Sequence, residues 1–155
     1  MLVGCGPSKP PDISIHNAAH SGDIEAIKQA IADGVNVNSK GIIGGSTPLL
    51  IAAMEGHNEV VELLISKGAD VDARQYGNGL TPLHFAALGD YKETAELLIA
   101  EGADMNANSD NGGTPLDWVI RSKPRLDKAR FLPEIADLLR KHGGKTSEGL
   151  KAEGK

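Results

Sequence analysis

A short motif that returns at a fixed interval is the feature that most constrains the fold of this chain. Thr-Pro-Leu occurs at residues 47–49, 81–83 and 114–116, at intervals of 34 and 33 residues. A second recurring stretch keeps the same spacing and opens on Gly34, Gly68 and Gly102. Such self-similarity is typical of arrays in which each repeat is one supersecondary unit that buries its apolar face against its neighbours.

Each position of the motif has a physical reason in a helix–turn–helix unit. The threonine hydroxyl can accept a free backbone N–H at a helix start, and proline fits the first turn. Gly68 and Gly102 suit the end of a second helix, where φ is often positive. That second helix shows helical apolar spacing over residues 60–64. Small pairs at 52–53 and 86–87, all alanine, predict close approach between neighbouring repeats.

The pattern resembles the ankyrin repeat over about residues 13–144. The resemblance implies an all-α fold, a solenoid of helix-turn-helix units with projecting β-hairpin loops. We expect a flexible tail at 1–11, a repeat domain at 12–144, and a C-terminal tail at 145–155 that begins as a short frayed helix. The repeats span about 13–46, 47–80, 81–113 and 114–144. Gln29 and Arg140 replace apolar residues of the inner repeats, so we expect an array that is complete at four repeats.

The resemblance also implies a function, because ankyrin proteins typically bind partner proteins with their hairpin tips and the concave face of their first helices. Carried over position by position, the expected surface consists of Ile42, Ile43, Ser46, Met54, Glu55, Gln75, Tyr76, Asn78, Leu80, Leu88, Ser109, Asp110, Asn111 and Arg121. Tyr76 is the strongest single candidate, since tyrosine commonly anchors interfaces. The alternative for Ile42 and Leu80 is packing against their own repeat.

Three further features leave two interpretations each. Ile51, Phe85 and Trp118 share one position of the first helix, which favours a core role over a binding role. The fourth repeat holds about eight extra residues around 122–132, rich in Lys and Arg; we expect a solvated loop, with docking of an acidic partner as the alternative. Asp90 stands where the second repeat has Gly56, so the turn geometry there is open.

The repeat pattern explains the residues that could otherwise suggest a catalytic or metal site. His16 and His84 occupy the family's histidine position, where the imidazole usually ties neighbouring backbone together, and Leu50 and Asp117 replace it elsewhere. No nucleophile motif or metal-ligand spacing is present. We therefore expect no enzyme activity, no cofactor and no metal. The net charge of -5 disfavours nucleic acid as a partner.

The residues before the repeats carry a weaker signal. Leu2-Val3-Gly4-Cys5, followed by a Pro/Ser/Lys-rich stretch, resembles the lipobox and tether of a bacterial lipoprotein. The preceding basic and apolar export segments are missing, since Met1 stands four residues before Cys5. Either the chain is trimmed or begins late, or the match is accidental. A membrane partner follows only if Cys5 is lipidated in a longer precursor, in the bacterial periplasm or tethered to a membrane; otherwise we expect a cytoplasmic protein.

Three functions remain in competition. The leading one is a monomeric protein-binding module or scaffold for an unidentified protein partner. The alternative is a regulator that inhibits an enzyme by covering its active site. The third, an enzyme or small-molecule binder, would need a deep pocket that an open solenoid rarely provides.

Overall fold

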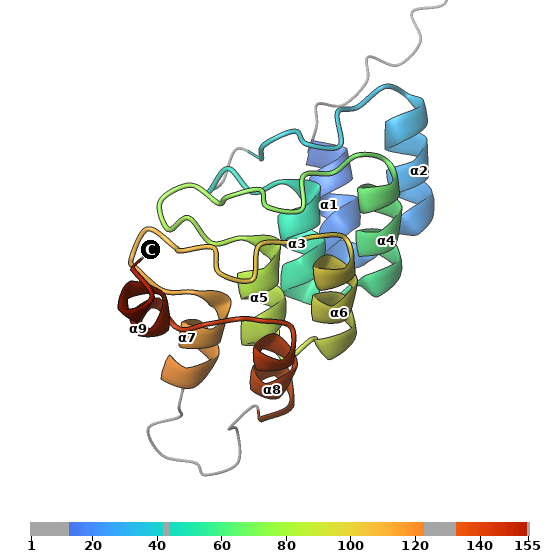
Figure 1. Cartoon of the computed structure of the whole chain (residues 1–155). Coiled ribbons are helices and arrows are strands. Elements are labelled where there is room, and N and C mark those ends of the chain that lie inside the picture. Colours follow the sequence, from blue (N-terminus) through green and yellow to red (C-terminus); the bar gives the residue numbers. More distant parts are fainter. Residues whose placement is uncertain (1–12, 42–43, 123–132, 155) are drawn as a thin grey trace, which may run out of the picture.

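The computed structural model describes residues 13–41, 44–122 and 133–154. Over these ranges the chain forms nine helices and no strand: α1 (Ile13–Ser21), α2 (Ile24–Ala32), α3 (Pro48–Glu55), α4 (Asn58–Ser66), α5 (Pro82–Gly89), α6 (Lys92–Ala100), α7 (Pro115–Arg121), α8 (Pro133–Lys141) and α9 (Ser147–Ala152). The first eight form four consecutive pairs that stack on one another (Figure 1). The predicted all-α solenoid is confirmed.

The helices lie in two rows. The inner row consists of α1, α3, α5 and α7, and the outer row consists of α2, α4, α6 and α8, each helix contacting its neighbour in the row. Three loops, which we call loop 1 (40–41 and 44–46), loop 2 (74–80) and loop 3 (108–113), extend past the inner row, on the side away from the outer row (Figure 1). The inner row and the loops therefore border the same side of the molecule.

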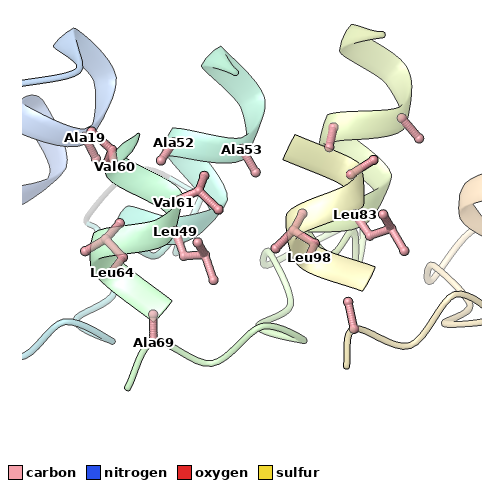
Figure 2. Close-up of a cluster of buried hydrophobic side chains, with 14 of the residues drawn as sticks. Ala19, Leu49, Ala52, Ala53, Val60, Val61, Leu64, Ala69, Leu83 and Leu98 are labelled. Carbon is pink, nitrogen blue, oxygen red and sulfur yellow. The ribbon is translucent and has the colours of Figure 1, made fainter. Parts of the chain in front are cut away.

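The core fills the space between the two rows. Leu49, Leu64, Leu83 and Leu98 are fully buried, and they recur at the same place in successive repeats (Figure 2). The alanine pair at 52–53 is also fully buried. Because an alanine side chain is only a methyl group, it lets helices of the inner row approach closely, and the packing then rests on aliphatic side chains rather than on aromatic rings.

The repeated threonines begin the inner helices, as the sequence predicts. The Thr47 hydroxyl accepts the N–H of Leu50 at 3.3 Å, and the Thr114 hydroxyl accepts that of Asp117 at 3.2 Å. These bonds satisfy backbone donors that have no partner within a helix. At Thr81 the backbone N–H donates to Nδ1 of His84 at 3.2 Å, and the N–H of Thr114 donates in the same way to Oδ2 of Asp117 at 3.0 Å.

The turns between paired helices settle the question that the sequence left open at residue 90. α3 ends on Gly56, with φ of 72°, and α5 ends on Asp90, with φ of 60°. Asp90 is the one non-glycine residue of the described chain with positive φ. At residue 56 glycine is also required by space, since a Cβ there would lie 2.5 Å from the ring of Tyr91.

A ladder of Asn and Asp side chains joins successive repeats, and the sequence pattern did not predict it. Oδ1 of Asn38 accepts the N–H of Asp70 at 2.8 Å, and Oδ1 of Asp72 accepts that of Asp104 at 2.9 Å. Oδ1 of Asn106 accepts the N–H of Lys145 at 2.8 Å. These bonds fix the spacing between repeats on the path that leads into the loops, so the loops start from equivalent positions.

The segment after the fourth repeat is bonded to it. Besides the bond between Asn106 and Lys145, the N–H of Ser147 donates to Oδ2 of Asp117 at 2.7 Å. Thr146 then caps α9 by accepting the N–H of Gly149 at 3.1 Å. At the two ends of the array, Gln29 and Arg140 are exposed. Among the described residues, no helix has the length and apolar character needed to cross a membrane.

Candidate functional site

The three loops form one hydrogen-bonded surface. Each loop is closed by its own backbone bond, from Gly41 N to Ser46 O (2.9 Å), from Gln75 N to Leu80 O (3.0 Å) and from Ser109 N to Gly113 O (3.0 Å). Neighbouring loops are joined as well, since Tyr76 N donates to Gly44 O at 3.1 Å and Asp110 N donates to Asn78 O at 2.8 Å. The described parts of neighbouring loops are therefore joined by backbone hydrogen bonds.

Tyr76 stands at the tip of loop 2 and is the most exposed large apolar side chain of the described residues, at 61%. Its ring lies against the backbone of Gly45 in loop 1, where an added Cβ would fall 1.9 Å from the ring. Nζ of Lys40 lies 4.2 Å from the ring centroid, within the range of a cation–π contact. The ring is thus held in place by loop 1 while much of it stays open to solvent.

Arg74 joins loop 2 to loop 3. Its guanidinium donates to the carbonyl oxygen of Asn108 at 2.9 Å and to Oδ1 of Asp110 at 2.8 Å. Both side chains of this ion pair are about half exposed, so its contribution is mainly to orientation rather than stability. Loops 1 and 2 thus begin with cations, Lys40 and Arg74, and the ammonium of Lys40 lies over the exposed ring of Tyr76.

The inner helices present two rows of side chains next to the loops. The first row is Asn17, Ile51, Phe85 and Trp118, and the second, three residues further along each helix, is His20, Met54, Leu88 and Arg121. Residues three apart share a helix face, and the helices lie side by side. We call the apolar members the apolar strip: Ile51, Met54, Phe85, Leu88 and Trp118.

The assignment of Ile51, Phe85 and Trp118 to the core was wrong in part. All three are half-buried rather than buried, because the position faces the loop side of the inner row and no further layer covers it. The signal was available in the sequence: these residues stand three places before Met54, Leu88 and Arg121, which were assigned to the binding face. Helical spacing places both rows on one surface.

The fourth repeat ties this face to loop 3. Nε1 of Trp118 donates to Oγ of Ser109 at 3.1 Å, and the guanidinium of Arg121 donates to the carbonyl oxygen of Gly112 at 3.1 Å. The indole therefore has its polar group satisfied while part of its ring stays accessible. Sequence reasoning missed Trp118 as a surface residue, although it correctly placed Arg121 in an exposed position.

Three predicted surface residues are corrected, because Ser46, Leu80 and Ser109 are buried. Each lies at the base of a loop and is occupied by contacts within the protein. Oγ of Ser46 accepts from Nε2 of Gln75 at 2.9 Å, and Oγ of Ser109 accepts from Trp118. Leu80 packs inward, the alternative considered for it. These buried side chains stabilise the loops and are not accessible to a partner.

The other predicted positions vary in how open they are. Asp110, Asn111 and Met54 are exposed, while Glu55, Gln75, Asn78 and Leu88 are half-buried. Oε1 of Glu55 lies 3.1 Å from Nδ1 of His20, and Nδ2 of Asn78 donates to Gln75 at 2.7 Å. Cys5, Ile42, Ile43 and the insertion from residue 123 to 132 lie outside the described residues.

The two side chains with displaced pKa values both serve helix starts. Burial lowers the pKa of His84, nearby Arg74 lowers it further, and the hydrogen bond to Gly113 only partly opposes this. Burial by itself would raise the pKa of Asp117, but N–H donors from Thr114 and Ser147 together hold it below its ordinary value. Both side chains are engaged in hydrogen bonds to the backbone of separate segments. This is the role that the family resemblance implies for the histidine position.

Other features of the described residues offer little for chemistry. No group of three or more His, Cys, Asp or Glu side chains in these ranges is placed to hold a metal ion. A cavity of about 230 Å³ lies between loops 1 and 2 and is lined by Asn38, Lys40, Thr47, Asp70, Ala73 and Arg74. Its walls carry both signs of charge, from Lys40 and Arg74 and from Asp70.

Comparison with protein-family models identifies the repeats. A family model described as "Ankyrin repeats (many copies)" matches residues 15–65 and 49–99, which together make up more than half of the 155 residues. No curated protein matches the chain. The structure continues the same paired unit beyond residue 99, in α7 and α8, which stack on α5 and α6.

Proposed function

The chain belongs to the ankyrin-repeat family, and from this membership we propose that it binds a partner protein through the apolar strip and the loop tips. Ankyrin repeats are generally protein–protein interaction modules, and the family is typically non-enzymatic. The expected role is that of a scaffold or adaptor surface. Its partner is a folded protein or a segment of one.

One observation carries the proposal. The two large apolar side chains that are exposed in the described residues are Met54 at 39%, in inner-row helix α3, and Tyr76 at 61%, in loop 2. Ile51, Phe85, Leu88 and Trp118 are partly exposed at equivalent positions of the neighbouring helices α3, α5 and α7. Scattered exposed hydrophobes are ordinary, but a contiguous group next to polar loops is typical of an interaction site.

The same surface supports binding better than catalysis. The side chains with displaced pKa values among the described residues, His84 and Asp117, are both engaged with helix starts. We therefore propose that the chain catalyses no reaction. Inhibition of an enzyme by covering its active site would use the same strip, so measuring the activity of a captured enzyme with and without the chain separates a regulator from a scaffold.

The test is capture of partners from a lysate of the source cells with two matched variants. Met54→Asp combined with Tyr76→Ala should remove a specific partner, because it puts a charge into the strip and deletes the most exposed ring. The control, Ala100→Asp, introduces the same charge at an exposed position of α6 in the outer row, and it should keep the partner.

Both variants must first show the thermal unfolding of a folded protein, since their sites are exposed and their substitutions should leave stability within about 0.5 kcal/mol. A partner that stays with the double variant, or that is lost equally with Ala100→Asp, places binding elsewhere and contradicts the proposed surface.

A further inference from the structure

The charges of this chain are divided between its faces. Between residues 13 and 113 the sequence carries fourteen Asp and Glu but only five Lys and Arg. Three of the five cations, Lys28, Lys67 and Lys92, lie in or directly after outer-row helices. The remaining two are Lys40 and Arg74, and both line the cavity between loops 1 and 2. The first three repeats are therefore acidic overall, and the two cations of their loops lie together at this cavity, which Asp70 also lines.

The two tip cations differ in how their charge is used. Arg74 is committed to loop 3, through its bonds to Asn108 and Asp110. Lys40 forms no ion pair with a carboxylate in the described residues, and its ammonium lies over the ring of Tyr76. Its positive charge thus stands next to the most exposed aromatic surface of the protein. A cation beside an apolar ring is suited to a carboxylate that is followed by an apolar side chain.

We propose that the partner contributes an acidic segment with a large apolar side chain, and that this segment docks at the tip surface formed by Lys40, Arg74 and Tyr76. This inference rests on the proposed function and gives the chemical class of the partner. A carboxylate of the segment meets Lys40 at the mouth of the cavity, and its apolar side chain covers the open part of the Tyr76 ring. The apolar strip then receives the remainder of the partner.

Exposed carboxylates on the outer helices disfavour docking of an acidic segment on that side of the domain. The outer helices α2, α4 and α6 expose Glu25, Glu59, Glu62, Glu93 and Glu96, and these carboxylates repel an acidic segment from that side. Attraction at the loops combined with repulsion along these three outer helices favours docking at the loops, as like charges disfavour wrong contacts in general. Because Lys40 is exposed, the attraction is screened by salt over about 10 Å at 0.1 M ionic strength.

Three peptides that differ only in charge test the proposal: acetyl-EELFEE-amide, acetyl-QQLFQQ-amide and acetyl-KKLFKK-amide. Each is titrated into the ¹⁵N-labelled full chain while amide signals are followed. The acidic peptide should bind the most tightly and should shift the signals of residues 40, 44–46 and 74–78. Its affinity should fall as salt is raised. Equal binding of the neutral or basic peptide, or shifts confined to the outer helices, overturns the proposal, as does the absence of any shift.

A pair of charge reversals isolates Lys40. Lys40→Glu should weaken the acidic peptide about tenfold, since an attraction is replaced by a repulsion of similar size. Lys67→Glu makes the same change in net charge at an exposed residue directly after α4, and it should weaken binding much less. Equal effects of the two reversals would show a general field rather than a site at the tip.

The same variants separate this inference from the function on which it rests. If a captured partner depends on Met54 and Tyr76 but binds Lys40→Glu as tightly as Lys67→Glu, the binding surface stands and the acidic-segment proposal fails. If the partner binds the Met54 and Tyr76 double variant as tightly as the parent chain, the proposed binding surface is wrong. Loss with Lys40→Glu as well as with the Met54 and Tyr76 double variant supports both.

Discussion

The third and fourth repeats hold the start of their inner helix with different chemistry at the same position. In the third repeat, His84 accepts the N–H of Thr81 at Nδ1 and donates from Nε2 to the carbonyl oxygen of Gly113, at 3.2 and 3.1 Å. In the fourth, Oδ2 of Asp117 accepts the N–H of Thr114 at 3.0 Å and that of Ser147 at 2.7 Å. Each side chain bridges its own helix start to the chain about thirty residues later.

The difference shows that the repeat specifies a bridge rather than a residue. A neutral imidazole can donate and accept, so it suits a backbone N–H on one side and a carbonyl on the other. A carboxylate only accepts, so it suits two N–H donors, and in the fourth repeat the second donor is the start of α9. The backbone group that the next segment of chain presents therefore decides which side chain fits.

Replacing either bridging side chain, His84 or Asp117, by alanine should change the free energy of unfolding more than the other substitutions below. His84→Ala should lower the free energy of unfolding by about 3 kcal/mol, because it opens a cavity at a fully buried position and leaves a buried donor and acceptor unpaired. Asp117→Ala should cost about 2 kcal/mol at pH 7 through its two unpaired N–H groups. Urea unfolding followed by circular dichroism measures both.

The two truncations should also differ in where they act. Asp117→Ala removes a bond that holds α9, so amides of residues 147–152 should lose hydrogen-exchange protection before the rest of the array. His84→Ala leaves α9 attached and should affect loop 3 through Gly113. If both variants lose protection first in the same segment, the two bridges are not the local devices that the hydrogen bonds indicate.

The pH dependence of stability sharpens the same contrast. The pKa of folded His84 lies below its ordinary value of 6.5, because burial disfavours the imidazolium. The unfolded chain therefore takes up a proton first as the pH falls below 6.5, so the His84 contribution is complete above that pH and declines below it. Asp117, whose folded pKa lies below its ordinary 3.8, contributes fully above 3.8 and is lost only as the pH falls through its lower folded value.

Urea midpoints measured between pH 7.5 and 4.5 should therefore fall in the wild-type chain, and less steeply in His84→Asn, which has no group titrating at that position. Asp117→Asn should keep the wild-type slope in this range and differ from it only near pH 4 and below. An unchanged slope in His84→Asn would assign the acid sensitivity to other groups.

The fold could be predicted from the sequence because the residues that define the repeat have well-defined local conformational preferences. Thr-Pro starts a helix, positive-φ glycine ends one, and an alanine pair needs a close neighbour, so Thr47, Gly68 and Ala52 could each be interpreted without coordinates. The site was harder to predict. Ser46 and Ser109 look like loop surface from their position in the sequence, and only the contacts with Gln75 and Trp118 show that they are buried.

The apolar strip also shows why burial is hard to predict from sequence, here for residues predicted to be buried that are partly exposed. An apolar residue at a repeated position predicts burial, and Phe85 is partly buried, but periodicity does not say how many layers cover it. The bond between Asp117 and Ser147 was equally out of reach, since its partner follows an insertion that breaks the 33- to 34-residue spacing. Pairings between distant loops depend on three-dimensional contacts that no local pattern encodes.

The smallest expected effect concerns the turn that ends the first helix of the third repeat. Asp90 adopts φ of 60°, whereas the second repeat has Gly56 with φ of 72°. A left-handed conformation is unfavourable for a residue with a Cβ, though less so for Asp than for most. Asp90→Gly should therefore stabilise the chain by about 0.5 kcal/mol, the relief of the turn being partly offset by the greater freedom of glycine in the unfolded state.

The matched control is Asp110→Gly, which removes a carboxylate at an exposed loop position and should be neutral or destabilising through the lost bond to Arg74. Urea midpoints of the two variants separate the backbone effect from the change in net charge. A loss of stability in Asp90→Gly would mean that the Asp side chain stabilises this turn by more than its backbone conformation costs, and that the third repeat has a local solution of its own here, as it does at His84.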